Sequence, residues 1–200
     1  MNKQNYDASM REVIERESAR GKKPSLLLHA CCAPCSSACL ERLKDFFAIT
    51  VLFYNPNIED VEYEKRKAEL KRLIGETGWA NTIDCDHDTG KFYSAVKGLE
   101  NCPEGGERCA ACFALRLEKT AETAKETGYD YFTTTLTVSP LKNAEVINRI
   151  GLSMAEKYGV EWLPTDFKKR GGYARSIELS REHSLYRQNF CGCIFSQNNS

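Results

Sequence analysis

The stretch SLLLHACCAPCSS, residues 25–37, joins an apolar run to three closely spaced cysteines. The run SLLLHA predicts a short buried strand, and Pro34 stands where the first turn of a helix tolerates proline. The stretch therefore predicts a strand, a turn and a helix. Ligand sites of parallel α/β sheets lie at the carboxyl ends of the strands, so we expect the cysteines that follow this strand at that edge.

Strands and helices are predicted to alternate over the rest of the chain. Further strands are expected at residues 49–55, 81–86, 129–137 and 161–167, and helices at 59–77, 90–97, 108–127, 143–158 and 173–185. This alternation favours a single α/β domain over residues 25–200, with a mostly parallel sheet flanked by helices. Residues 1–24 are interpreted as a polar N-terminal extension.

The composition predicts a cytoplasmic protein that uses its cysteines chemically. The chain has 200 residues, 42% of them hydrophobic, which is enough for a core without cross-links. Its first residues lack the apolar run of about 7 to 15 residues of a signal peptide. No segment approaches the roughly 18 apolar residues of a membrane span. In the cytoplasm thiols stay reduced, so the ten cysteines are expected to serve metal or redox chemistry.

Net charge does not indicate a nucleic-acid partner, because 28 basic residues balance 28 acidic ones. Residues 164–190, however, combine six cations with Tyr173 and Tyr186. Such a mixture can hold phosphates and stack bases, but an ordinary solvated helix face has the same pattern. The six cations are Lys168, Lys169, Arg170, Arg175, Arg181 and Arg187.

The cysteines near the first predicted helix differ in their expected roles. Cys35 falls in its first turn, where backbone amides and the helix dipole favour a thiolate, so it is a candidate ligand or nucleophile. Cys39 lies one turn further on and is predicted to be a small buried apolar residue. Cys85 and Cys102 have no partner at a diagnostic spacing, and we expect no chemical role for them.

Two cysteine pairs lie further along the chain. Cys109 and Cys112 open a predicted helix three residues apart, so both thiols share one face; this fits a metal, a redox pair or two buried thiols. Cys191 and Cys193 flank Gly192, and in an extended segment both thiols point to one side. They could bind one metal ion or close a small, easily reduced disulfide.

Three cysteine groups, CCxxC, CxxC and CxC, offer seven thiols, which exceeds one four-coordinate site. His29 beside them could tune a metal centre, or could simply be bonded to backbone. We find no GxGxxG, Walker A, HExxH or SGGxDS motif. The economical division, which spacing alone does not fix, assigns Cys31, Cys32, Cys109 and Cys112 to a 4Fe-4S cluster and leaves Cys35, Cys191 and Cys193 for a second centre.

Seven motifs in order resemble the epoxyqueuosine reductases of the QueH type over nearly the whole chain after residue 24. They are HACCAPCSS, YNPNI, EYEKRK, RCAACFALRL, TTTLTVSPLKN, DFKKRGGYARSIELS and LYRQNFCGCIFS. The resemblance implies a fold akin to the adenine-nucleotide α-hydrolases (HUP-like), with cysteines where those relatives hold phosphate. It also implies reduction of epoxyqueuosine to queuosine, the final step of queuosine biosynthesis, at the wobble position of the tRNAs for Asp, Asn, His and Tyr.

The resemblance also assigns roles to individual cysteines. The CxC pair corresponds either to a redox-active disulfide or to ligands of a separate mononuclear iron. In some members an aspartate stands where this chain has Cys35, so a thiolate here would be a softer ligand of that iron. The positions that match the ligands of the 4Fe-4S cluster are Cys31, Cys32, Cys109 and Cys112.

The implied partners are a tRNA carrying epoxyqueuosine and an electron donor that the sequence does not identify. A tRNA thiolase of the ATP-pyrophosphatase type is a rival, but it needs the absent SGGxDS loop. The other rival is a zinc-stabilised RNA-binding module that is not an enzyme. We expect Ser139 near the modified base and assign tRNA binding to Lys142, Lys168, Lys169, Arg170 and Arg175.

Overall fold

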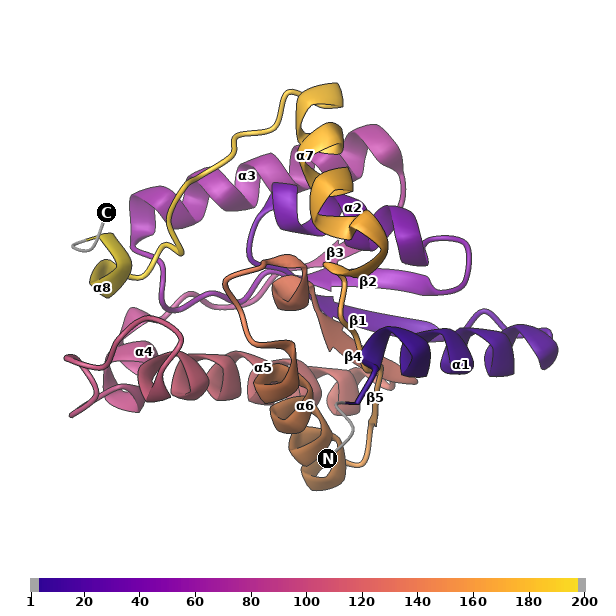
Figure 1. Cartoon of the computed structure of the whole chain (residues 1–200), viewed down its shortest axis with the longest axis horizontal. Helices are drawn as coiled ribbons and strands as arrows, with labels where there is room; N and C mark the ends of the chain where they lie inside the picture. The colour runs from indigo at the N-terminus through magenta and orange to yellow at the C-terminus, as the bar shows by residue number, and fades with distance from the viewer. Residues whose placement is uncertain (1–3, 198–200) are drawn as a thin grey trace.

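The computed structural model, which describes residues 4–197, has a five-stranded parallel sheet between two layers of helices (Figure 1). The strand order β3-β2-β1-β4-β5 is that of a doubly wound sheet. This confirms the predicted α/β fold with a parallel sheet. The strands are β1 Ser25–His29, β2 Ala48–Leu52, β3 Asn81–Ile83, β4 Tyr131–Thr134 and β5 Glu161–Trp162.

The helices form a layer on each face of the sheet. Figure 1 shows α2 (Ala33–Leu43), α3 (Asp60–Thr77) and α7 (Gly172–Glu182) on one face, and α5 (Glu107–Thr127) and α6 (Ala144–Tyr158) on the other. None of the helices in the described part of the chain is long and apolar enough to cross a membrane. The shorter elements are α4 Thr89–Ala95, α8 Ile194–Gln197 and the 3-10 helices η1 Thr135–Val138 and η2 Lys169–Gly171.

The central strand β1 is buried on both faces, as its continuous apolar run predicts. Leu26 and Leu28 pack into the cluster that includes residues of α2 and α3, whereas Leu27 packs with residues of α5. All three leucines are fully buried. The two layers therefore hold β1 firmly, and the turn that follows it starts from a fixed point.

Four predicted strands are shorter in the structure, including the one expected at 49–55, which ends at Leu52 of β2. The expected strand at 129–137 is wrong in its last part, because residues 135–138 form η1. The Thr134 hydroxyl accepts a hydrogen bond from the Leu136 amide at 3.2 Å, which turns the chain out of the sheet. The strands expected at 81–86 and 161–167 pair only as β3 and β5, since both lie at the edges of the sheet.

Helix α1 (Tyr6–Ala19) lies within the segment interpreted as a polar extension. Its Met10 is completely buried in the same core cluster as Leu26, and Asp7 forms an ion pair with Arg42 of α2. The segment thus contributes to the core, a finding that its charged composition hid. The domain limit at residue 24 stays a prediction, and residues 1–3 and 198–200 lie outside the described part.

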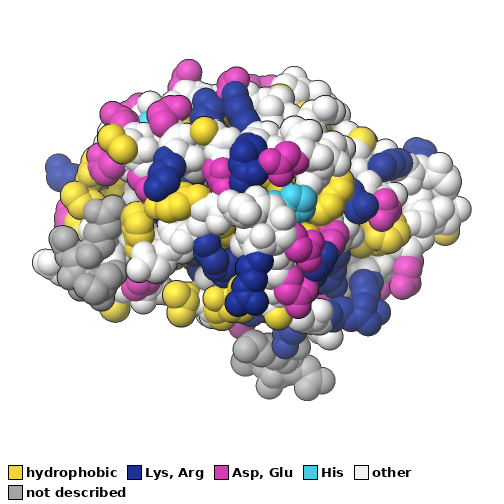
Figure 2. All heavy atoms as spheres, turned by 90° about the horizontal axis from the view of Figure 1, so that it is seen from above, with side chains coloured by type: hydrophobic (Ala, Val, Ile, Leu, Met, Phe, Trp, Pro, Cys, Tyr) yellow, Lys and Arg dark blue, Asp and Glu magenta, His cyan; other side chains and the backbone are white. Residues whose placement is uncertain are grey.

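Charges of both signs alternate over the surface. On the face shown in Figure 2, Lys and Arg side chains lie among Asp and Glu side chains rather than in one positive field. Arg72 of α3, for example, forms ion pairs with both Glu69 and Glu76. Any attraction of a polyanion must therefore come from a local group of cations.

We expect the packing of α6 on β5 to be intolerant of one added methyl group. A Cβ on Gly151 would lie 2.3 Å from the Trp162 ring, so Gly151→Ala should lower the free energy of unfolding by about 1–3 kcal/mol. Gly75→Ala on α3 is the control, because a Cβ there meets nothing within 4 Å. This variant should raise the free energy of unfolding by up to about 1 kcal/mol. Equal urea midpoints for the two variants would contradict this packing.

Candidate metal centre

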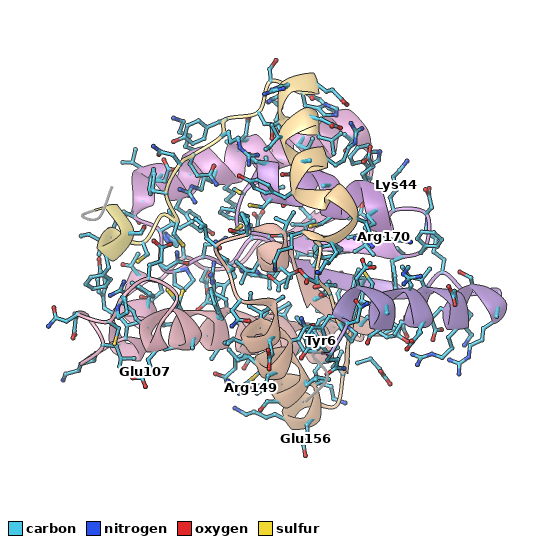
Figure 3. All side chains as sticks on the ribbon, in the orientation of Figure 1. Tyr6, Lys44, Glu107, Arg149, Glu156 and Arg170 are labelled. Atoms are coloured by element: carbon cyan, nitrogen blue, oxygen red, sulfur yellow. The ribbon has the colours of Figure 1, made fainter. Side chains whose placement is uncertain are left out.

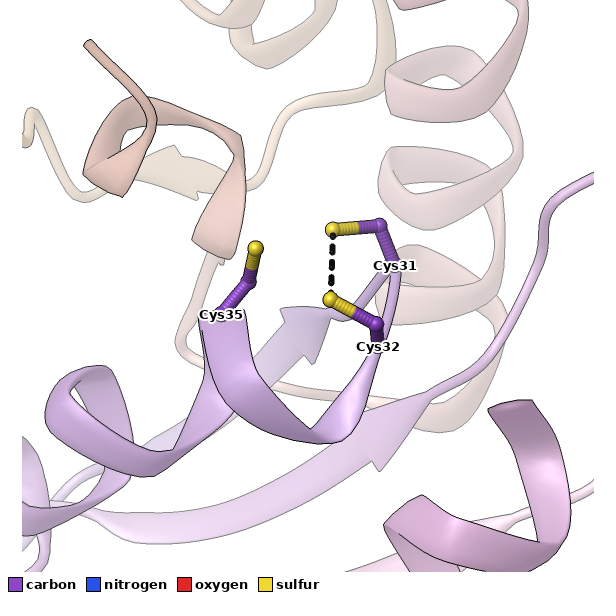
Figure 4. Close-up of side chains that lie close together, drawn as sticks. All are labelled: Cys31, Cys32 and Cys35. Carbon is purple, nitrogen blue, oxygen red and sulfur yellow. Dashed lines mark hydrogen bonds between the residues drawn. The ribbon is translucent and has the colours of Figure 1, made fainter. Parts of the chain in front are cut away.

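The turn between β1 and α2 brings three cysteine sulfurs together (Figure 4). Cys31 and Cys32 follow β1, and Cys35 lies in the first turn of α2. Their sulfurs all lie within 4.8 Å of one another, and those of Cys31 and Cys32 are 3.8 Å apart. Tetrahedral coordination with bonds of about 2.3 Å separates sulfurs by ~3.8 Å. Within residues 4–197 this is the one group of three or more potential metal ligands.

The three thiols share their protons unequally. Hydrogen bonds from Cys32 and Cys35 hold the pKa of Cys31 well below its usual range despite burial. The pKa of Cys32 and that of Cys35 are raised, because each keeps its proton to bond its neighbours and both are buried. The pKa that is lowered is thus that of Cys31 and not that of Cys35, where the helix dipole was expected to favour a thiolate. The role of Cys35 as a ligand or nucleophile stays a prediction. A metal would deprotonate all three, since only thiolates bind it.

A cavity of about 560 Å³ opens over this group and reaches the carboxyl-terminal segment. Cys31 and Cys35 line it from one side, and Cys191 lines it from the segment before α8. The fold thus joins the first cysteine motif to the last, although they are 160 residues apart in number (191 − 31). Other residues that line the cavity include Arg116, Ser139, Lys142 and Tyr173.

The remaining four cysteines of the three motifs lie around this centre but outside the tight group. Cys109 borders a small neighbouring cavity together with Cys191. Cys112 and Cys193 belong to the same apolar cluster, which also contains Phe92. All of these are free thiols in the structure. The division of the seven thiols between a 4Fe-4S cluster and a second centre therefore stays a prediction.

The cysteines with no expected role have ordinary surroundings. Cys39 is fully buried and donates a hydrogen bond to the Cys35 carbonyl at 3.2 Å, which fits a small buried residue. Cys85 donates to the Phe53 carbonyl, also at 3.2 Å. Neither sulfur belongs to the tight group.

The segment that carries Cys191 and Cys193 is held by a buried arginine of α3. Arg66 donates from Nη1 to the Cys191 carbonyl at 3.0 Å and from Nη2 to the Phe190 carbonyl at 3.4 Å. Glu62 pairs with its Nε at 2.6 Å. Gly192 takes a φ of +101°, which only glycine adopts without strain. Arg66 therefore fixes the backbone from which the CxC thiols project.

His29 has a structural role at the end of β1. It is fully buried, its Nε2 lies 3.0 Å from the Tyr54 carbonyl, and its Nδ1 lies 2.8 Å from the Thr134 hydroxyl. The carbonyl can only accept, so Nε2 carries a proton. Burial and the charge of Arg116 lower the pKa of His29 to about 3. Of its two interpretations, the structure supports the histidine bonded to backbone.

Lys142, expected to bind tRNA, lies beside the thiols. It lines the same cavity as Cys31 and Cys191. Burial alone would lower the pKa of Lys142, but the electrostatic influence of the sulfurs of Cys191, Cys31 and Cys35 outweighs burial and raises it. The side chain therefore stays protonated within the centre.

Two cations of the site were missed in the sequence. Arg116 lies four residues after Cys112 and seven after Cys109, so helical spacing could have placed it on the face of the CxxC thiols. No spacing relative to a cysteine could have indicated Arg66. It lies in a charged helix and meets Cys191 only through the return of the carboxyl-terminal segment.

The basic segment forms a second cavity next to the first. Lys168, Lys169 and Arg170 border it near the start of α7, and Figure 3 shows Arg170 at that position. Lys169 and Arg170 are exposed, and Arg170 Nε lies 3.9 Å from an Asp7 carboxylate oxygen. Lys168 is partly buried and pairs with Asp166 at 2.8 Å. The two cavities share Pro140, Lys142 and Tyr173.

Arg175, the fifth cation expected to bind tRNA, is occupied by carboxylates. Its guanidinium pairs with Glu41 at 2.8 Å, and Glu178 and Glu182 lie at 3.0 and 2.8 Å. These acids neutralise its charge locally. It therefore offers less to a phosphate than Lys169 or Arg170 does.

Fold and site together define an α/β protein with a buried, cysteine-rich centre at the carboxyl edge of a parallel sheet. The family model described as epoxyqueuosine reductase QueH matches residues 26–199. The Streptococcus pyogenes protein of that name is 44% identical over 96% of this chain and 78% of its own length. The one from Thermotoga maritima is 39% identical over 86% of this chain and 90% of its own. The chain belongs to the QueH family.

Gly192→Ala should disturb the CxC segment through two effects. The left-handed φ costs ~1 kcal/mol for alanine. Crowding adds ~1 kcal/mol, since the new Cβ would lie 3.0 Å from both Arg66 and Ile58. Cys193 is buried in the wild-type structure. We expect maleimide to label it roughly tenfold faster in the Gly192→Ala variant than in wild type.

Gly105→Ala isolates the backbone effect. It also has a positive φ, of +83°, but a Cβ there meets nothing within 4 Å. We expect this variant to lose stability without a change in Cys193 labelling, which peptide mass spectrometry can follow. Unchanged labelling in both variants would show that Arg66 does not hold the segment.

Proposed function

We propose that this chain reduces epoxyqueuosine to queuosine at the wobble position of tRNA. The observation that carries the proposal is the convergence of three cysteine sulfurs, of Cys31, Cys32 and Cys35, beside a cavity that Cys191 also lines. Relatives over most of the chain are named epoxyqueuosine reductase. The family name supports the substrate, and the thiol-lined cavity supports a reductive reaction within it.

The donor set fits an iron–sulfur cluster. Seven thiols surround the centre, and thiolates are the ligands that iron–sulfur clusters use. Arg116, almost fully buried beside them, has two polar atoms that bond nothing in residues 4–197, as expected where an anionic group belongs. When bound, a 4Fe-4S cluster supplies single electrons. We propose Cys31, Cys32, Cys109 and Cys112 as its ligands.

The thiols left over would form the second centre. Reduction of an epoxide consumes two electrons and two protons, so a partner for a one-electron cluster is needed. We propose that Cys191 and Cys193 provide it, either as a redox disulfide or, with Cys35, as ligands of a mononuclear iron. Lys142 Nζ, protonated beside them, would donate a hydrogen bond to the epoxide oxygen.

The double cavity suits a nucleotide that leaves its strand. A base drawn into the thiol-lined cavity would place its phosphates toward the second cavity, where Lys168, Lys169 and Arg170 lie. Exposed Tyr173 stands where the two cavities meet and could stack on a neighbouring base. The electron donor remains to be identified, and a cytoplasmic location, where tRNA is found, stays a prediction.

Cys31→Ala should abolish epoxyqueuosine reduction, because it removes both the thiolate of the tight group and a proposed cluster ligand. The measurement is nucleoside mass spectrometry of epoxyqueuosine tRNA after incubation with dithionite-reduced protein. Cys39→Ala is the matched control, since this thiol is equally buried and bonds only a carbonyl. Wild-type protein that holds its metal yet leaves the epoxide intact would refute the proposed function.

Neutralising two exposed cations should weaken tRNA binding and its salt dependence. For Lys169→Gln with Arg170→Gln, we expect the slope of log K against log salt to fall by about 2. Arg175→Gln should change it less, because three glutamates already neutralise that guanidinium. Filter binding at several salt concentrations would measure both. Equal slopes for the double variant and wild type would exclude this surface.

A further inference from the structure

Arg116 is the charged group most deeply placed in the centre. It lies in the middle of α5 with 1% of its surface exposed, yet it lines the cavity together with Cys31, Cys35 and Cys191. Cys112 lies one helical turn before it on the same face. A permanent positive charge therefore stands on the inner wall of a cavity built from thiols.

The hydrogen bonds of Arg116 are incomplete. Nη1 donates to the Asn55 side-chain oxygen at 3.1 Å, while Nε and Nη2 are buried and bond nothing in the part of the chain that the structure describes. Two other buried or half-buried arginines have carboxylates, since Arg66 pairs with Glu62 and Arg42 with Asp7. Buried Arg108 has none, but it donates to two backbone carbonyls, whereas Arg116 bonds one side chain only.

No carboxylate of residues 4–197 forms an ion pair with Arg116, so its counter-ion must be another group. An unpaired charge inside a protein is strongly unfavourable.

The groups that favour the charge of Arg116 are sulfurs. Burial alone would lower the pKa of Arg116, but the electrostatic influence of the sulfurs of Cys112, Cys191 and Cys31 outweighs burial and raises it. Asn55, which also donates to the Ala30 carbonyl at 2.8 Å, holds the guanidinium through Nη1 and leaves Nε and Nη2 unbonded. The two free groups are thus available to an anionic ligand of the cysteines.

We propose that Arg116 is the counter-cation of the iron–sulfur cluster and raises its reduction potential. This rests on the proposed function, which supplies the cluster. A cluster bound by four thiolates is negative, and one-electron reduction adds a further negative charge. A fixed cation and its N–H groups near the sulfurs stabilise the reduced form more than the oxidised form. Arg116 is a positioning and tuning residue, not a catalytic one.

Replacement of the charge should make the cluster harder to reduce. We expect Arg116→Met, loaded anaerobically with iron and sulfide, to have a reduction equilibrium constant at least tenfold lower, about 59 mV for one electron. Arg116→Lys should recover most of that shift. Redox titration followed by electron paramagnetic resonance measures both. Lys119→Gln, on the same helix but paired with Glu122, controls for net charge and should leave the potential unchanged.

A second measurement separates tuning from a structural role. Without the cluster, Arg116 is an uncompensated buried charge, so the metal-free Arg116→Met protein should melt at or above the temperature of metal-free wild type. A variant that destabilises the metal-free protein, or one that holds the cluster at an unchanged potential, would overturn the assignment. Wild-type protein that takes up no iron and sulfide would overturn the proposed function and this inference together. A bound cluster of normal potential in Arg116→Met would overturn the inference alone.

Discussion

The turn between β1 and α2 must hold three sulfurs close together inside the protein, and much of the surrounding structure follows from that requirement. A thiolate or an anionic cluster is stable in such a place only where the backbone is rigid and positive charge is near. Rigidity comes from β1, the central strand, which is buried on both faces. Positive charge comes from Arg116 and Lys142, which line the same cavity.

The carboxyl-terminal segment completes the centre because it brings Cys191 to the cavity that Cys31 and Cys35 line. It runs from α7 along α3 to α8, as Figure 1 shows. The Arg66 hydrogen bonds to the Cys191 and Phe190 carbonyls hold it beside the first cysteine motif. Because Gly192 packs against Arg66 itself, the CxC geometry depends on contacts between segments more than a hundred residues apart. Cys31 and Cys191, far apart in the sequence, thereby line the same cavity.

The positions of most helices and strands were predicted better than the contacts between them. The strand–turn–helix at residues 25–37 and the ends of the helices expected at 59–77 and 108–127 lie where predicted, because local periodicity and the capping glycines Gly78 and Gly128 determine them. The edge strands were predicted too long, since pairing partners and not propensity set their ends. Helix α1 was missed because two of its four buried residues, Asp7 and Glu17, are charged, which hides the apolar side of the helix.

The site was predicted as a set of cysteines but not as a geometry. Spacing identified all seven thiols, yet it could not show that Cys31, Cys32 and Cys35 are the ones that converge. Nor could it distinguish an available cation from one already paired: Arg175 and Lys169 look alike in the sequence, and only the packing of α7 on α2 brings Glu41 to Arg175. Long-range ion pairs of this kind leave no local pattern.

The central claim is that the buried thiols hold an iron–sulfur cluster. The most direct test is to purify the protein anaerobically and measure iron, zinc and acid-labile sulfide per chain together with the visible absorption. We predict a brown protein with about four irons and four sulfides, or one further iron, after reconstitution. A colourless protein that holds zinc without sulfide, even after attempted reconstitution, would contradict this account.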